Sequence, residues 1–157
     1  MRHKTYTLLL LIVLLATTAC DKIIMIDFSE LPATAQSFIE NNFKGIPVDL
    51  VQKYKEEPAY KASLSDGTYI WFRSNGDWEK IENSEPGLSF TLLQNLIPHN
   101  IISYIKYYYP EATVISVSKN SDGYSVTLNT YTTIDFDKNG EADKKVPGNG
   151  WTDTEIQ

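Results

Sequence analysis

The sequence predicts an α+β protein built from two similar modules, each a helix followed by antiparallel strands. Two segments, 31–43 and 97–109, lie 66 residues apart and place apolar residues at the spacing of one helix face. After each come segments in which apolar and polar residues alternate, the pattern of half-buried strands. Asn-Gly pairs at 75–76 and 139–140 predict tight hairpin turns. A chain of 157 residues has room for one domain of this kind.

The two predicted helices carry similar boundary signals. Pro32 and Pro98 lie at their starts, where proline is tolerated because the amide hydrogen it lacks would be unpaired there. Gly45 and Pro47 end the first helix, and Pro110 ends the second. Each helix is therefore expected to bury one apolar stripe.

The strand segments correspond in pairs: 48–54 with 114–120, 59–65 with 123–129, and 68–74 with 132–138. In the last pair, Ile70 and Phe72 have apolar counterparts, which predicts that they face the helices. Tyr69 and Trp71 correspond to a threonine and an aspartate. The opposite face is therefore expected to be aromatic in the first module and polar in the second, and open to solvent or to a partner.

The amino terminus reads as an export signal. A basic start, an apolar run over 7–16 and small residues before Cys20 form the three parts of a secretory signal. The run has about ten residues, whereas a membrane-spanning helix needs roughly 20, so a retained anchor is the weaker alternative. Thr18, Ala19 and Cys20 resemble the lipobox of bacterial lipoproteins, although Thr17 stands where leucine is usual. Ordinary cleavage that leaves a free thiol is the other alternative.

These boundaries give a domain plan. Residues 1–19 are the predicted signal peptide, 20–28 a lipidated linker, and 29–157 one domain with repeats at 29–82 and 95–145 and a short C-terminal tail. Residues 83–89 are the expected connection between the repeats. The predicted location is the bacterial cell envelope, with the lipid on Cys20 holding the protein at the outer membrane, facing the periplasm.

Charge excludes one class of partner. Without residues 1–19 the chain has 12 basic and 20 acidic side chains, a net charge of −8. Nucleic acid would repel such a chain, as would an anionic membrane surface. Membrane attachment is therefore expected through acyl chains, at about 0.8 kcal/mol per buried methylene.

The segments 30–43, 69–78 and 134–141 resemble the PepSY-like, β-lactamase-inhibitor-like family of Bacteroidetes secreted proteins and lipoproteins. The resemblance covers roughly residues 25–145, and its most specific elements are the Leu-Pro helix start and the turn that ends in Trp78. The second repeat departs from it at Ala142. The resemblance implies one antiparallel sheet, made by both modules, with helices on one side and no enzymatic activity. It does not carry a binding target with it.

The sequence offers little support for a catalytic site or a metal-binding site. Beyond the predicted signal, His99 is the only histidine, and no nucleophile motif accompanies it. Zinc sites favour several Cys or His ligands, and neither a cofactor nor an enzymatic activity is predicted. A weak calcium alternative remains, because five residues fall at loop positions 1, 3, 5, 6 and 9, although Val146 stands where a bidentate glutamate is expected. They are Asp135, Asp137, Asn139, Gly140 and Asp143.

The leading hypothesis is a non-catalytic envelope lipoprotein that binds a protein or peptide through the open sheet face. Tyr69, Trp71 and Trp78 are the candidate contact residues, as aromatic anchors within an acidic rim. Plain packing against the second module is the competing interpretation of these aromatics. A small-ligand or cation sensor around Asp135 and Asp137, and a structural envelope component, are the other hypotheses.

Overall fold

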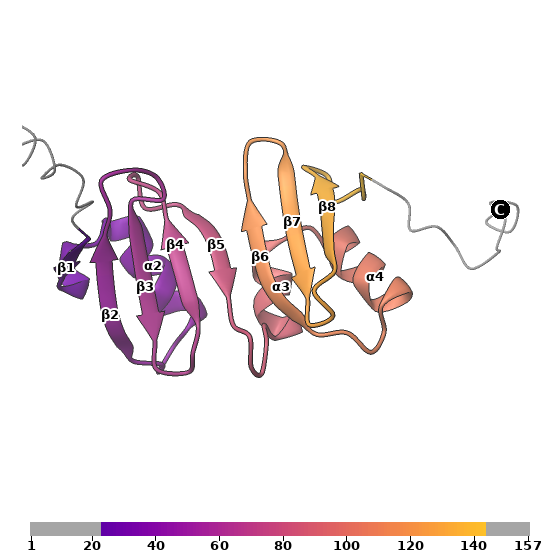
Figure 1. Cartoon of the computed structure of the whole chain (residues 1–157), viewed down its shortest axis with the longest axis horizontal. Helices are drawn as coiled ribbons and strands as arrows, with labels where there is room; N and C mark the ends of the chain where they lie inside the picture. Colours follow the sequence, from indigo (N-terminus) through magenta and orange to yellow (C-terminus); the bar gives the residue numbers. More distant parts are fainter. Residues whose placement is uncertain (1–22, 144–157) are drawn as a thin grey trace, which may run out of the picture.

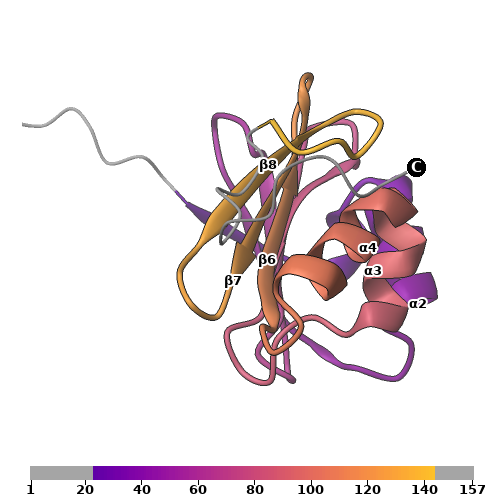
Figure 2. The same cartoon turned by 90° about the vertical axis from the view of Figure 1, so that its right-hand side faces the viewer.

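The computed structural model describes residues 23–143 and shows eight strands in one antiparallel sheet (Figure 1). The strands follow one another across the sheet in sequence order, from β1 to β8. The helices α2, α3 and α4 lie together on one face, as Figure 2 shows. The predicted α+β class, single sheet and one-sided helices are therefore confirmed. The strands are β1 (Ile24–Ile26), β2 (Val48–Lys53), β3 (Tyr60–Leu64), β4 (Tyr69–Phe72), β5 (Trp78–Glu82), β6 (Val114–Lys119), β7 (Gly123–Leu128) and β8 (Thr133–Asp137).

The two long helices occupy matching positions in the two halves. Helix α2 (Ala33–Asn42) and helix α4 (His99–Tyr108) begin and end 66 residues apart. The residue before each is a proline with nearly the same backbone, φ −52° and ψ 140° at Pro32 and φ −53° and ψ 140° at Pro98. The extended conformation of this residue sets the angle at which the chain enters each helix.

An Asn-Gly turn packs against the start of each long helix. Gly76, after β4, has φ +87°, and Gly140, after β8, has φ +83°. A Cβ atom at Gly76 would lie 2.8 Å from the Cβ of Pro32, and one at Gly140 would lie 3.0 Å from the Cβ of Pro98. Glycine thus serves two needs here, a left-handed backbone and close contact with a helix.

The core lies between the sheet and the helices. Ile70 and Phe72 are fully buried, as the alternation predicts, and the ring of Phe72 meets Phe38 of α2 edge-on at 5.8 Å. In the second half Phe136 meets Tyr104 of α4 in the same arrangement, at 5.4 Å. Edge-to-face pairs at this distance are favourable beyond the area they bury. An aromatic pair therefore fastens each long helix to the sheet.

Two elements were not predicted from the sequence. Helix α3 (Phe90–Leu96) follows the predicted connection; the Ser89 side chain accepts a hydrogen bond from the Leu92 N–H, and Leu93 is fully buried. Strand β1 falls in the predicted linker, at whose last residue the 3₁₀ helix η1 (Phe28–Glu30) begins, and β1 pairs with β2. Within residues 23–143 no helix has the length and apolar character to span a bilayer.

Candidate functional site

The face of the sheet turned away from α2, α3 and α4 carries ordered rows of side chains. Strand pairing sets Lys61 of β3, Trp71 of β4 and Lys80 of β5 directly opposite one another. The same row continues into the second half through Ser118, Ser125 and Asp135. Because opposite residues on neighbouring strands point to the same face, this row crosses the open face from one half to the other.

Four residues on this face form a group that we call the Trp71 cluster: Lys61, Tyr69, Trp71 and Lys80. The Tyr69 and Trp71 rings lie 6.2 Å apart, and the Lys61 ammonium lies 4.2 Å from the first ring and 4.9 Å from the second. The Lys80 ammonium also lies 4.9 Å from the Trp71 ring. Since these lysines belong to the strands on either side of β4, the indole stands between two cations, each attracted by its π-electrons.

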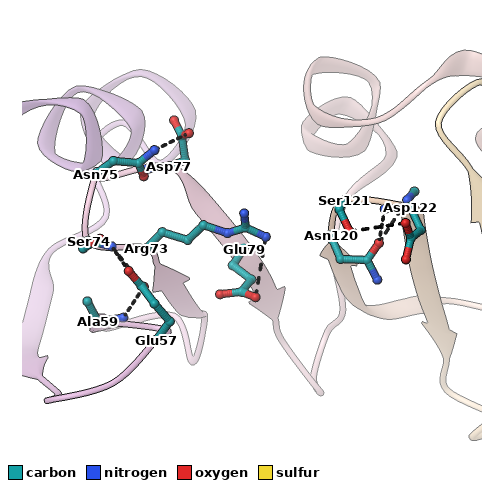
Figure 3. Close-up of polar contacts among 11 residues, drawn as sticks. Glu57, Ala59, Arg73, Ser74, Asn75, Asp77, Glu79, Asn120, Ser121 and Asp122 are labelled. Carbon is teal, nitrogen blue, oxygen red and sulfur yellow. Dashed lines mark hydrogen bonds and ion pairs between the residues drawn. The ribbon is translucent and has the colours of Figure 1, made fainter.

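The two lysines of the cluster differ in their acidic neighbours. Lys80 forms an ion pair with Glu82, its neighbour on the same face of β5. Arg73, directly after β4, forms an ion pair with Glu79, in which a guanidinium nitrogen lies 3.7 Å from a carboxylate oxygen (Figure 3). Between residues 23 and 143 no carboxylate lies within ion-pair distance of Lys61. Lys61 is therefore the cluster cation most available to an external anion.

A shallow depression of about 350 Å³ lies beside Trp71, walled by residues 54–58 of the loop between β2 and β3. Glu57 holds this loop in place, because its carboxylate accepts hydrogen bonds from the N–H groups of Ala59 and Ser74 (Figure 3). Hydrogen bonding by Ser74, through its side chain first and its backbone next, lowers the pKa of Glu57. The loop is thus fastened to the β4–β5 turn on the edge of the cluster.

Trp78 does not belong to the exposed surface, contrary to the sequence-based expectation. Its side chain is 7% exposed, and its ring lies 6.2 Å from Phe38 of α2. A β-bulge in the β4–β5 pair sets Trp78 opposite Phe72, whereas Lys80 is opposite Trp71. The extra residue turns Trp78 to the helix side, which makes it a core residue. Tyr69, by contrast, is 39% exposed and Trp71 is half-buried on the open face.

The candidate calcium residues lie in and after β8, where their oxygens already accept hydrogen bonds. The Asp137 carboxylate accepts from the N–H groups of Asn139 at 2.8 Å and Glu141 at 2.9 Å. These bonds, that from Glu141 first, lower the pKa of Asp137. Asp135 accepts from the Ser125 hydroxyl. Both carboxylates thus have a structural role in the hairpin, and no group of three possible metal-binding side chains gathers within residues 23–143.

The remaining predicted residues lie apart from the Trp71 cluster. His99 occupies the exposed first turn of α4, on the helix side of the sheet. Cys20 and the predicted signal peptide lie outside the described residues, as does the tail beyond residue 143.

Comparison with known proteins places this architecture in a family. A family model described as "Putative beta-lactamase-inhibitor-like, PepSY-like" matches residues 58–143, more than half of the chain. The chain belongs to this family. Among curated protein sequences no match was found. The PepSY-like assignment therefore supports the fold but does not identify a binding partner.

Solved structures show the same fold over the whole PepSY-like domain. A protein of Bacteroides thetaiotaomicron, described as a "putative calcium-regulated periplasmic protein", is 23% identical with a TM-score of 0.71, covering 80% of this chain and 98% of its own. A Bacteroides vulgatus periplasmic protein of unknown function is 26% identical with a TM-score of 0.70, covering 78% and 98%. A second B. vulgatus periplasmic protein is 22% identical with a TM-score of 0.69, covering 80% and 98%.

Sequence reasoning named the aromatics of this PepSY-like surface but missed Lys61 and Lys80. One signal could have found Lys61. A three-residue turn at 65–67 that ends in Gly67, the residue type preferred for its left-handed third position, joins β3 to β4. The register that follows from this turn length sets Lys61 opposite Trp71. Lys80 could not be placed in this way, because its position depends on the bulge.

Proposed function

We propose that this PepSY-like protein is a non-catalytic module that binds a protein or peptide through the Trp71 cluster on its open sheet face. One observation carries the proposal: Tyr69 and Trp71 stand on the face that the helices leave uncovered. Tryptophan and tyrosine are enriched among the interface residues that dominate binding energy. The depression beside Trp71 offers space for a partner side chain.

The proposed location is the bacterial cell envelope. The three structural neighbours are described as periplasmic proteins, which supports export of this chain as well. Lipid attachment at Cys20 and retention at the outer membrane are further parts of the proposal, and they rest on the sequence alone. Since β1 begins at Ile24, four residues beyond the proposed attachment point, a lipid on Cys20 would hold the sheet close to the membrane.

Replacement of Trp71 by alanine is expected to reduce partner capture by at least about tenfold, because an interface anchor contributes more than 1–2 kcal/mol. Capture would be measured by cross-linking in intact envelopes with a photoreactive group placed at Ser118, in the same row. Tyr107→Ala is the matched control, since Tyr107 is 77% exposed on α4. Equal capture by Trp71→Ala and the unaltered protein, with both folded by circular dichroism, would refute the proposed surface.

Calcium sensing is the second candidate, since one structural neighbour is described as "putative calcium-regulated". The geometry weighs against a site at residues 135–143, because no three possible metal-binding side chains gather within residues 23–143 and the Asp135 and Asp137 carboxylates already accept hydrogen bonds within the hairpin. We expect 10 mM calcium to leave the melting temperature unchanged. A site with a dissociation constant of about 1 mM would add about 1.4 kcal/mol, enough to raise the melting temperature by several degrees. Such a rise, absent in Asp137→Asn, would contradict this expectation.

A further inference from the structure

We propose that the partner of the open face is an extended acidic peptide segment, with carboxylates at alternate positions that bind the ammonium groups of Lys61 and Lys80 on either side of Trp71. This inference rests on the proposed function and specifies the chemistry of the partner. It is carried by the arrangement of the two cations around one aromatic ring, that of the half-buried Trp71 on the open face, each 4.9 Å from its centre.

The spacing of the cations suits an extended chain. Lys61 and Lys80 stand on strands separated by β4, so their backbones are roughly 10 Å apart, two inter-strand distances. Side chains at positions i and i+2 of an extended peptide point to the same side about 7 Å apart. Because Glu and Asp side chains are flexible, their carboxylates can make up the difference between the spacing of the peptide residues and the spacing of the two lysine backbones. The peptide would then cross β3, β4 and β5, with its backbone over the Trp71 ring.

The charges on the face indicate where an acidic segment can lie. The row of the Trp71 cluster is cationic in the first half, but in the second half it holds Ser118, Ser125 and the exposed Asp135. Asp135 would repel a carboxylate, whereas Lys61 has no acidic partner among residues 23–143. Since the whole chain carries a net charge of −6, an acidic ligand gains attraction only at such a local site.

Charge removal at Lys80 and at Glu82 should change the affinity for an acidic peptide in opposite directions. The Glu82 carboxylate pairs with Lys80, so it competes with any ligand carboxylate for the same ammonium group. Removing the lysine charge should weaken binding of an acidic peptide, whereas removing the glutamate charge should strengthen it. A surface that recognised only shape or apolar groups would respond to neither change.

The experiment titrates the full chain, purified in detergent, with a ten-residue peptide that carries glutamate at alternate positions, and with the same peptide carrying glutamine. Calorimetry should show binding of the first peptide, about tenfold weaker in Lys61→Gln and in Lys80→Gln. Glu82→Gln should bind it more tightly. Lys106→Gln is the matched control, because the Lys106 ammonium lies 4.7 Å from the Phe90 ring on the helix side. Binding should also weaken as salt is raised from about 0.05 to 0.5 M.

Equal affinity for the glutamate and glutamine peptides, or binding of neither, would overturn the acidic-peptide inference. The proposed function would survive that result if Trp71→Ala still lost its partner in intact envelopes. If instead Trp71→Ala kept the partner, both proposals would fall together. Loss of glutamate-peptide binding in Lys106→Gln as well as in Lys61→Gln would also overturn the inference, since the effect would then reflect net charge.

Discussion

Replacement of Phe72 by alanine is expected to lower the free energy of unfolding by about 3–5 kcal/mol. Phe72 is fully buried at the end of β4, where its ring meets Phe38 of α2 edge-on at 5.8 Å. Truncation removes this contact and leaves a cavity that the neighbouring Trp78 and Ile81 backbones on β5 cannot close, because both are held in the sheet ladder. Urea denaturation followed by far-ultraviolet circular dichroism measures the loss.

The second half supplies an internal comparison for this prediction. Phe136→Ala removes the corresponding contact with Tyr104, at 5.4 Å, and should cost a similar amount. Tyr107→Ala, at a side chain that is 77% exposed, should change stability by less than about 0.5 kcal/mol. A domain of this size is stabilised by about 5–15 kcal/mol, so either core variant should remain folded but marginal. A loss below about 1 kcal/mol in Phe72→Ala would contradict the packing described.

The faces of the strands could be predicted because alternation in a strand is a local property. Ile70 and Phe72 were placed toward the helices, and Tyr69 and Trp71 away from them, from the period of two together with the apolar counterparts in the second repeat. Trp78 was misplaced because the same rule fails at a bulge. Trp78 and Lys80 are two residues apart and would share a face in a regular strand, yet pairing sets one opposite Phe72 and the other opposite Trp71. Nothing in the local sequence marks the extra residue between them.

Helix α3 and strand β1 escaped prediction for a different reason. Each is too short to be stable by itself, at seven and three residues, and isolated helices shorter than about 12 residues are marginal in water. Tertiary contacts form them: burial of Leu93 in the core stabilises α3, and pairing with β2 forms β1. Such contacts join segments whose proximity becomes known only once the sheet order is known.

Only part of the candidate site could be predicted from the sequence. The aromatic residues could be found because one strand contributes both, whereas the cations come from the two neighbouring strands. The sequence suggested aromatic anchors with acidic groups at the rim. The structure instead sets two lysines against the central ring, and Glu79 and Glu82 form ion pairs with Arg73 and Lys80. Cross-strand neighbours therefore decide the charge that a partner would meet.

Replacement of Gly76 by alanine is expected to cost about 2–5 kcal/mol, through two effects that a control can separate. Its backbone has φ +87°, which is unfavourable for any side chain by about 1–2 kcal/mol. A Cβ there would also lie 2.8 Å from the Pro32 Cβ and 3.1 Å from the Ala35 nitrogen at the start of α2, an overpacking cost of about 1–3 kcal/mol.

Gly67 isolates the backbone effect, since its φ is +83° and a Cβ would meet nothing within 4 Å. Gly67→Ala should therefore lose only about 1–2 kcal/mol. Gly140→Ala should fall between the two, because its nearest contact, with the Pro98 Cβ, is 3.0 Å. Thermal and urea unfolding of the three variants measures the order Gly76, Gly140, Gly67. If Gly67→Ala proved as harmful as Gly76→Ala, the close contact between the turn and α2 would be refuted as a source of the loss.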